Sequence, residues 1–166
     1  FVAAGHEITF YDAGHIPGSA HVLVDDGETR LLYTADFHTD DSRLLSGSTA
    51  RPDADVVVCE STYANVDHES RATVEALFAE TTRTTLWEGG TVVVPAFAIG
   101  RTQELLMVCA ANDIDCYVDG MGVEVLSMLR EHPDFLRDAD ALNRAARHAR
   151  TVTGRDGQRK RIADQN

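Results

Sequence analysis

The stretch FYDAGHIPGSAHVLVDDGETRLLYTADF, residues 10 to 37, decides how the first third of this chain folds. The short runs HVLVDD and TRLLYTADF read as strands and flank Gly27, and this arrangement predicts a β-hairpin. His15 stands in a glycine-flanked turn before the hairpin, and Asp36 ends the returning strand. The hairpin would therefore bring Asp36 back alongside the loop that carries His15.

Two interpretations of His15 and Asp36 are open. Taken singly, each is an ordinary polar turn residue. Taken together, an imidazole and a carboxylate that converge at one sheet edge are the minimum for a Zn²⁺ or Mn²⁺ ligand set, and further ligands must come from elsewhere. Glu60, which closes the apolar run DVVVCE, is either a cap or rim acid or a group that orients a ligand or accepts a proton.

The hydrophobic periodicity changes along the chain. Strands are expected in EITFYDA (7–13) and, as a fully buried strand, in ADVVVCES (54–61). A helix is expected over 71–90, with one apolar stripe of Val74, Leu77, Phe78 and Thr81. Then follow a buried strand, a loop and a helix over 91–113, a short strand at 116–120, and helices over 122–132 and 138–150. The change from antiparallel strands to alternating β and α falls near residues 60 to 66, where we expect a domain boundary.

Composition narrows the function classes. Hydrophobic residues make up 43% and charged residues 25%, as in soluble globular proteins, and no apolar run approaches the roughly 20 residues of a membrane span. The net charge of −12 and the single lysine, Lys160, favour a protein of a high-salt cytoplasm over an ordinary acidic protein. The same charge argues against generic nucleic-acid binding, unless metal ions supply positive charge at a local site. The three cysteines are expected to be buried free thiols in a reducing compartment. The missing initiator methionine and the abrupt end in RKRIADQN suggest a fragment.

Several motifs together resemble a known family. AGHIPGSA, LLYTADF and CESTYA, in that order and spacing, resemble the third and fourth motifs of metallo-β-lactamase-fold hydrolases followed by the first β-CASP motif. GGTVVVPAFAIGRTQELL resembles the opening strand, loop and helix of a β-CASP domain, and GRDGQRKRIADQN resembles a segment before a later strand. The likeness is greatest to archaeal ribonuclease J and to cleavage-and-polyadenylation-factor-like mRNA 3′-end processing nucleases.

The resemblance implies a fold and a site. The fold would be α/β, with part of a metallo-β-lactamase αββα domain in residues 1–64 joined to part of a β-CASP domain with a parallel sheet in residues 65–166. His15 would ligate one zinc and Asp36 would bridge two zincs, with Mn²⁺ as the alternative; Asp36 and Glu60 would be the catalytic carboxylates. Arg101 would either approach the RNA backbone or pack at a helix start. The histidines that match no ligand position are expected at the surface or behind a ligand: His6, His21 and His38.

The implied activity is metal-dependent hydrolysis of single-stranded RNA, in mRNA 3′-end processing or RNA decay, by a cytoplasmic homodimer or RNA-processing complex. The family's HxHxDH cluster and its two later histidine motifs do not occur in this sequence. We therefore expect the chain by itself to bind zinc weakly or not at all and to leave RNA uncut. The alternatives are an inactive β-CASP scaffold subunit and a metallo-β-lactamase-fold hydrolase of small molecules. A DNA-repair nuclease is disfavoured, because that branch tends to carry aspartate at the position of Glu60.

Overall fold

The structure is a computed structural model that describes residues 1–152. The chain divides into two compact units, Phe1–Asp67 and a second that begins at His68. Among the described residues, no helix has the length and apolar character needed to cross a membrane. The predicted segments GRDGQRKRIADQN and RKRIADQN lie outside the described residues. The fold class is mixed α/β, as predicted, whereas the assignment of residues 1–64 and 65–166 to two named domains stays a prediction.

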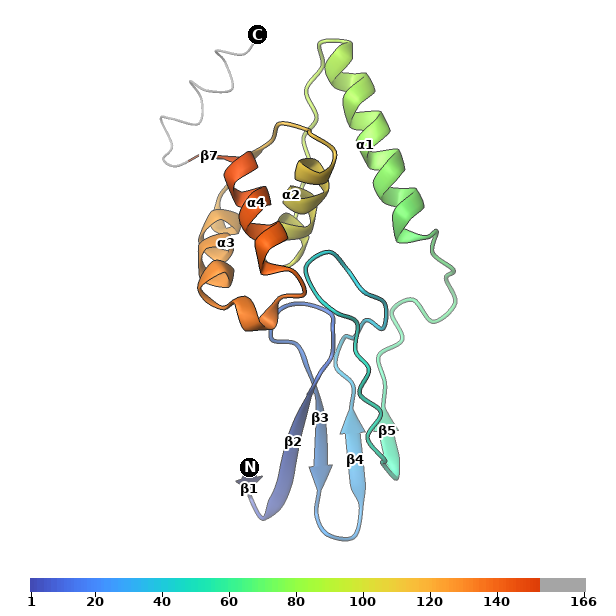
Figure 1. The fold of residues 1–166 in the computed structure, drawn as a ribbon. Helices are drawn as coiled ribbons and strands as arrows, with labels where there is room; N and C mark the ends of the chain where they lie inside the picture. The colour runs from blue at the N-terminus through green and yellow to red at the C-terminus, as the bar shows by residue number, and fades with distance from the viewer. Residues whose placement is uncertain (153–166) are drawn as a thin grey trace. The chain divides into compact units, whose positions relative to one another are not determined.

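The first unit is built on a five-stranded sheet (Figure 1). Its strands, in sheet order, are β1 (Val2–Ala3), β2 (His6–Asp12), β3 (Ala20–Asp25), β4 (Arg30–Tyr33) and β5 (Val56–Val58). The pairs from β1 to β4 are antiparallel, and β5 joins β4 in parallel. The predicted hairpin at Gly27 is confirmed: Asp25 pairs with Arg30 in the register of β3 and β4.

The hairpin turn is held by two carboxylates. Asp25 accepts a hydrogen bond from the amide of Gly27, and Asp26 accepts from the amides of Glu28 and Thr29, at 2.7 to 2.9 Å. Gly27 has a φ of +91°, a conformation that glycine adopts without steric cost. The turn chemistry and the strand-forming runs on either side therefore specify the same hairpin.

Strand β5 corrects one expectation. Residues 56–58 form a parallel strand beside β4, as the apolar run suggested, but the run is not buried. Val56, Val57 and Val58 are 45%, 55% and 47% exposed. Within residues 1–152, β5 pairs on one side only and is the edge of its sheet. An apolar run thus predicted the strand correctly and its burial wrongly.

The second unit contains the helices. They are α1 (Arg71–Trp87), α2 (Arg101–Ala111), α3 (Met121–Glu131), the 3₁₀ turn η1 (Pro133–Phe135) and α4 (Ala139–His148), with the short strands β6 (Tyr117–Asp119) and β7 (Arg150–Val152) paired in parallel. Helix α2 packs mainly against α4. The sequence predicts all four α-helices, and α4 has an acidic start and a basic end, with Asp138 capping it and Arg147 in its last turn.

Two expectations about the second unit are wrong. The predicted buried strand TVVVPAF has no strand in residues 91–97, and Val93 and Phe97 are each 84% exposed. No described strand pairs with this segment, so its backbone lacks the ladder that defines a strand. The stripe predicted on α1 is also wrong in part, because Val74 and Leu77 are exposed whereas Phe78 packs beside buried Ala79.

The cysteines divide by environment. Cys109 is buried and Cys116 half-buried, and both pack in one apolar cluster with Ala79 and Ile114. Cys59 is exposed, which corrects the expectation that all three thiols are buried. The three thiols are free in the structure, as predicted.

Candidate functional site

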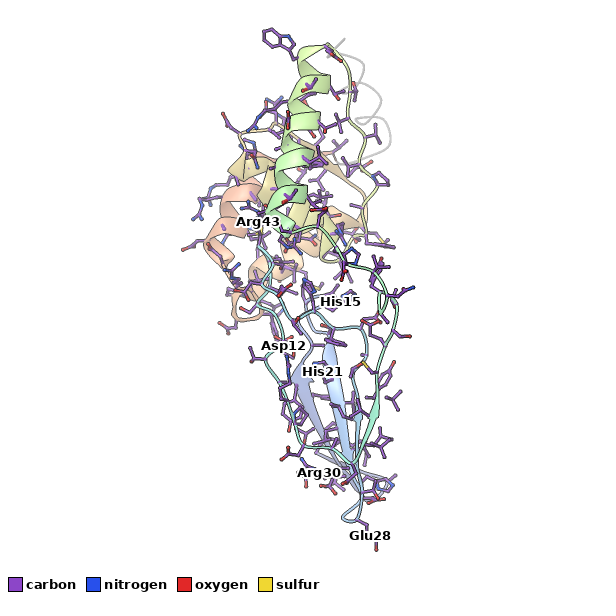
Figure 2. The ribbon with its side chains drawn as sticks, turned by 90° about the vertical axis from the view of Figure 1, so that its right-hand side faces the viewer. Asp12, His15, His21, Glu28, Arg30 and Arg43 are labelled. Carbon is purple, nitrogen blue, oxygen red and sulfur yellow. The ribbon has the colours of Figure 1, made fainter. Side chains whose placement is uncertain are left out.

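The three predicted site residues follow strands that end at the same edge of the first sheet. Because β2 and β4 each run antiparallel to β3, and β5 runs parallel to β4, the carboxyl ends of β2, β4 and β5 share that edge. His15 follows β2, Asp36 follows β4 and Glu60 follows β5. Figure 2 shows His15 and Asp12 at this edge, with Glu28 and Arg30 at the opposite end of the sheet.

The loop that carries His15 is fixed by hydrogen bonds within itself. The hydroxyl oxygen of Ser19 accepts hydrogen bonds from the amides of His15 (3.1 Å) and Ile16 (3.2 Å). The amide of Ala13 donates to the carbonyl of Ser19 at 3.1 Å, which closes the loop at its base. His15 itself is exposed. The backbone is therefore held while the side chain remains accessible to a ligand.

The loop of His15 lies directly against the segment that follows Asp36. The amide of His38 donates to the carbonyl of Ala13 at 2.9 Å, and the amide of Ser48 donates to the carbonyl of His38 at 2.7 Å. Gly14 makes this approach possible: a Cβ there would lie 2.6 Å from both the His38 carbonyl oxygen and the Ser48 amide nitrogen. Its φ of +68° also lies in the region that favours glycine. The backbones of the two predicted ligand loops are thus in contact.

Asp36 and Glu60 are connected through Thr34. The hydroxyl of Thr34 donates to the carbonyl of Ala35 at 2.8 Å and accepts from the amide of Glu60 at 3.2 Å. Ala35 has a positive φ of +49°, which is uncommon for a residue with a Cβ and turns the chain sharply before Asp36. Asp36 itself is exposed. One buried hydroxyl therefore joins the backbones of the second and third candidate segments.

The carboxylate of Glu60 makes a local contact. It accepts a hydrogen bond of 2.7 Å from the amide of Thr62, two residues on, and Glu60 is half-buried. This contact matches the capping interpretation of Glu60 as well as the catalytic one. It leaves the other carboxylate oxygen to meet a ligand or a proton.

The side chains themselves do not form a metal cluster. No bond between the side chains of His15, Asp36 and Glu60 occurs, and within residues 1–152 no group of three histidine, cysteine or acidic side chains is arranged to hold an ion. An imidazole and a carboxylate are nevertheless donors that zinc accepts, so His15 and Asp36 fit a partial ligand set. The structure brings their loops together and does not complete a coordination shell.

His21 was expected either at the surface or behind a ligand. It is 5% exposed, which rules out the first of these alternatives. Its Nδ1 lies 2.8 Å from the carbonyl oxygen of Thr34 and its Nε2 lies 3.0 Å from the hydroxyl of Ser48. The two-residue alternation of β3 provides a signal for its burial, because His21 and buried Leu23 share one face of the sheet.

In the second unit, Arg101 opens helix α2 after Gly100 and is exposed. The neighbouring Gln103 is fully buried, and its amide nitrogen donates to the carbonyls of Ala98 (3.0 Å) and Gly122 (3.3 Å). Gln103 therefore anchors the turn in front of α2, and Arg101 is left with its side chain toward solvent. This placement is compatible with both predicted roles of Arg101.

Comparison with known proteins gives no matching family model. The chain is 35% identical over 158 residues to "Probable RNase MJ4" of Methanocaldococcus jannaschii, which is 92% of this chain and 37% of that protein. It is 36% identical over 149 residues to transcription termination factor FttA of Methanothermobacter thermautotrophicus, 81% of this chain and 23% of the factor. It is 35% identical over 105 residues to cleavage and polyadenylation specificity factor subunit 3 of Dictyostelium discoideum, 63% of this chain and 14% of the subunit. The chain spans little more than a third of the length of the first of these relatives, and less of the others.

Proposed function

Because this chain belongs to the family of archaeal ribonucleases and cleavage and polyadenylation specificity factors, we propose that the whole protein hydrolyses phosphodiester bonds in RNA. The similarities confirm the family resemblance that the motifs around His15, Asp36 and Glu60 predicted. The observation that best supports the activity is the shared sheet edge from which these three residues follow.

We expect the whole protein to bind two Zn²⁺ ions, with Mn²⁺ as the alternative. His15 would hold one ion, and Asp36 would lie between both, because one carboxylate can offer an oxygen to each. Such ions neutralise the charge of a phosphodiester and lower the pKa of bound water. The remaining ligands would come from other parts of the whole protein.

The residues of this chain would position the reacting groups. Ser19 fixes the backbone of His15 through two amide hydrogen bonds, so little conformational freedom is lost there on binding. Thr34 fixes the turn before Asp36 and the amide of Glu60. Glu60, half-buried beside this turn, would orient a ligand or accept a proton.

The expected substrate is single-stranded RNA. The chain carries 27 acidic and 15 basic residues, so its overall charge repels a polyanion. Binding would depend on local positive charge, from the ions and from exposed arginines such as Arg101. Assembly into a homodimer or an RNA-processing complex is part of the same proposal.

Asp36→Ala in the full-length protein tests this function, with Asp53→Ala, an exposed carboxylate at the far end of the β4–β5 connection, as the matched control. Cleavage of a labelled single-stranded RNA with Zn²⁺ or Mn²⁺ should fall by about 10²-fold or more in the first variant and stay unchanged in the second. Wild-type rates in Asp36→Ala would refute the role of Asp36. A wild-type protein that binds RNA and never cuts it would instead be the inactive scaffold, and one that hydrolyses only small esters would be the small-molecule hydrolase.

A further inference from the structure

We propose that His21 is a positioning residue that sets the relative placement of the His15 loop and the Asp36 loop. This inference rests on the proposed function, because it concerns the same site. It is carried by the two hydrogen-bond contacts of one buried imidazole, each with a group that holds one of the two loops.

The first bond reaches the Asp36 side. His21 Nδ1 lies 2.8 Å from the carbonyl oxygen of Thr34, the residue directly after β4 and two positions before Asp36. A carbonyl oxygen only accepts, so Nδ1 carries the hydrogen. Thr34 is itself 6% exposed. Loss of this donor would leave a buried carbonyl without its side-chain partner.

The second bond reaches the His15 side through Ser48. His21 Nε2 lies 3.0 Å from the Ser48 hydroxyl, and that hydroxyl donates to the carbonyl of Asp12 at 2.6 Å. Asp12 is the last residue of β2, three positions before His15. Ser48 is 3% exposed, so water does not replace a missing partner without rearrangement.

These bonds close a ring around the imidazole. The ring continues from Ser48 through its amide to the carbonyl of His38, and from the amide of His38 to the carbonyl of Ala13. The aromatic ring of Phe37 lies beside the imidazole of His21, with 5.7 Å between the two ring centroids. His21 therefore lies on the middle strand, β3, and connects the ends of the strands on both sides through its two contacts.

His21→Leu in the full-length protein tests the inference, because leucine fills the space and donates no hydrogen bond. Leu23→Ala is the control: Leu23 is 4% exposed on the same face of β3 and its removal creates a cavity without touching the ring of hydrogen bonds. Two quantities are measured. One is zinc affinity, by competition with a chromophoric chelator; the other is the amide hydrogen exchange of His38 and Ser48 in the metal-free protein.

We expect His21→Leu to weaken zinc binding by about 10- to 100-fold, as for other residues that support a ligand from behind. We also expect exchange at the two amides to accelerate by about 10-fold or more. Leu23→Ala should lower the melting temperature and leave both quantities near wild type. Unchanged affinity and exchange in His21→Leu, or an equal loss in Leu23→Ala, would overturn the inference.

Two milder variants keep the test decisive where His21→Leu does not fold. In His21→Asn, the side-chain amide nitrogen can replace Nδ1 in the contact with the Thr34 carbonyl. In His21→Gln, the side-chain amide nitrogen can replace Nε2 in the contact with the Ser48 hydroxyl. Each variant keeps one of the two contacts and should bind zinc more weakly, and exchange the two amides faster, than wild type; wild-type values in both variants would overturn the inference. A wild-type protein that binds zinc and does not cut RNA would refute the nuclease proposal without contradicting the positioning role of His21.

Discussion

The amide of His38 donates a 2.9 Å hydrogen bond to the carbonyl of Ala13. Ala13 stands two residues before His15, and His38 stands two residues after Asp36, so this one bond joins the two loops in which a metal ligand is predicted. Backbone atoms make the bond, which means that side-chain substitutions disturb it only by changing the space or the conformation around it. The first two predictions concern two residues of the His15 loop, Gly14 and Ser19.

Gly14→Ala should destabilise the first unit more than Gly18→Ala. Both glycines lie in the same loop with positive φ, +68° and +85°, but a Cβ at Gly18 meets nothing within 4 Å whereas one at Gly14 meets two backbone atoms at 2.6 Å. The conformational cost shared by both is about 1–2 kcal/mol, and the clash should bring Gly14→Ala to about 2–5 kcal/mol. Urea unfolding of the two variants measures the difference; equal midpoints would contradict the close approach.

Ser19→Ala should loosen the His15 loop. The substitution removes the acceptor for the amides of His15 and Ile16 and should cost about 1 kcal/mol. Amide exchange at these two residues should accelerate, and RNA cleavage by the full-length protein should fall. Ser46→Ala, at an exposed serine outside the loop, is the control. Slow, wild-type exchange at His15 in Ser19→Ala would show that the hydroxyl does not hold the loop.

Asp26→Asn should reduce the acid sensitivity of the hairpin. The amide of Thr29, followed by that of Glu28, holds the pKa of Asp26 below its usual value of 3.8. A carboxyl group with a lower pKa in the folded state stabilises the fold above its unfolded pKa, and that contribution is lost as the pH falls through the folded pKa. The melting temperature of wild type should therefore drop more steeply below pH 3.8 than that of Asp26→Asn. Parallel curves for the two proteins would argue against the turn contacts.

Cys59 should be the first thiol to react with iodoacetamide. It is exposed, whereas Cys109 is buried and Cys116 is half-buried. A hydrogen bond to Cys109, together with burial, raises the pKa of Cys116 well above its usual range, and the same hydrogen bond lowers the pKa of Cys109. Burial should nevertheless keep Cys109 slow. Peptide mass spectrometry follows the three sites; Cys59→Ser should abolish the fast phase, and early labelling of Cys109 or Cys116 would contradict the packing of the second unit.

The features that the sequence predicted well are those set by local chemistry. The hairpin at Gly27 follows from the two strand-like runs that flank this glycine, and α4 follows from its acidic start and arginine-rich end. The common edge of the strands before His15 and Asp36 follows from the hairpin alone, because the returning strand must end beside the loop that precedes it. Glu60 was harder to place, since its position depends on the long connection from β4 to β5.

The features that the sequence predicted poorly depend on distant partners. An apolar run such as Val56–Val58 specifies a strand but not what covers it, and residues 91–97 have strand-like composition without a neighbouring strand in the described part of the chain. The sequence left open whether His21 is at the surface or buried, because its burial depends on hydrogen-bond partners, and Ser48 lies 27 residues away. Periodicity along β3 predicts which face of the sheet His21 occupies, whereas its hydrogen-bond partners are known only from the fold.

The ring around His21 has a consequence for how this protein can change over evolutionary time. Ala13 and His38 take part in it through main-chain atoms, which every residue type except proline can supply. Selection on the ring itself would therefore act on few side chains, chiefly Gly14, His21 and Ser48. Diverged descendants of this chain can thus keep the same local architecture while replacing loop residues other than these three, the candidate ligands and the residues that hold the ligand loops.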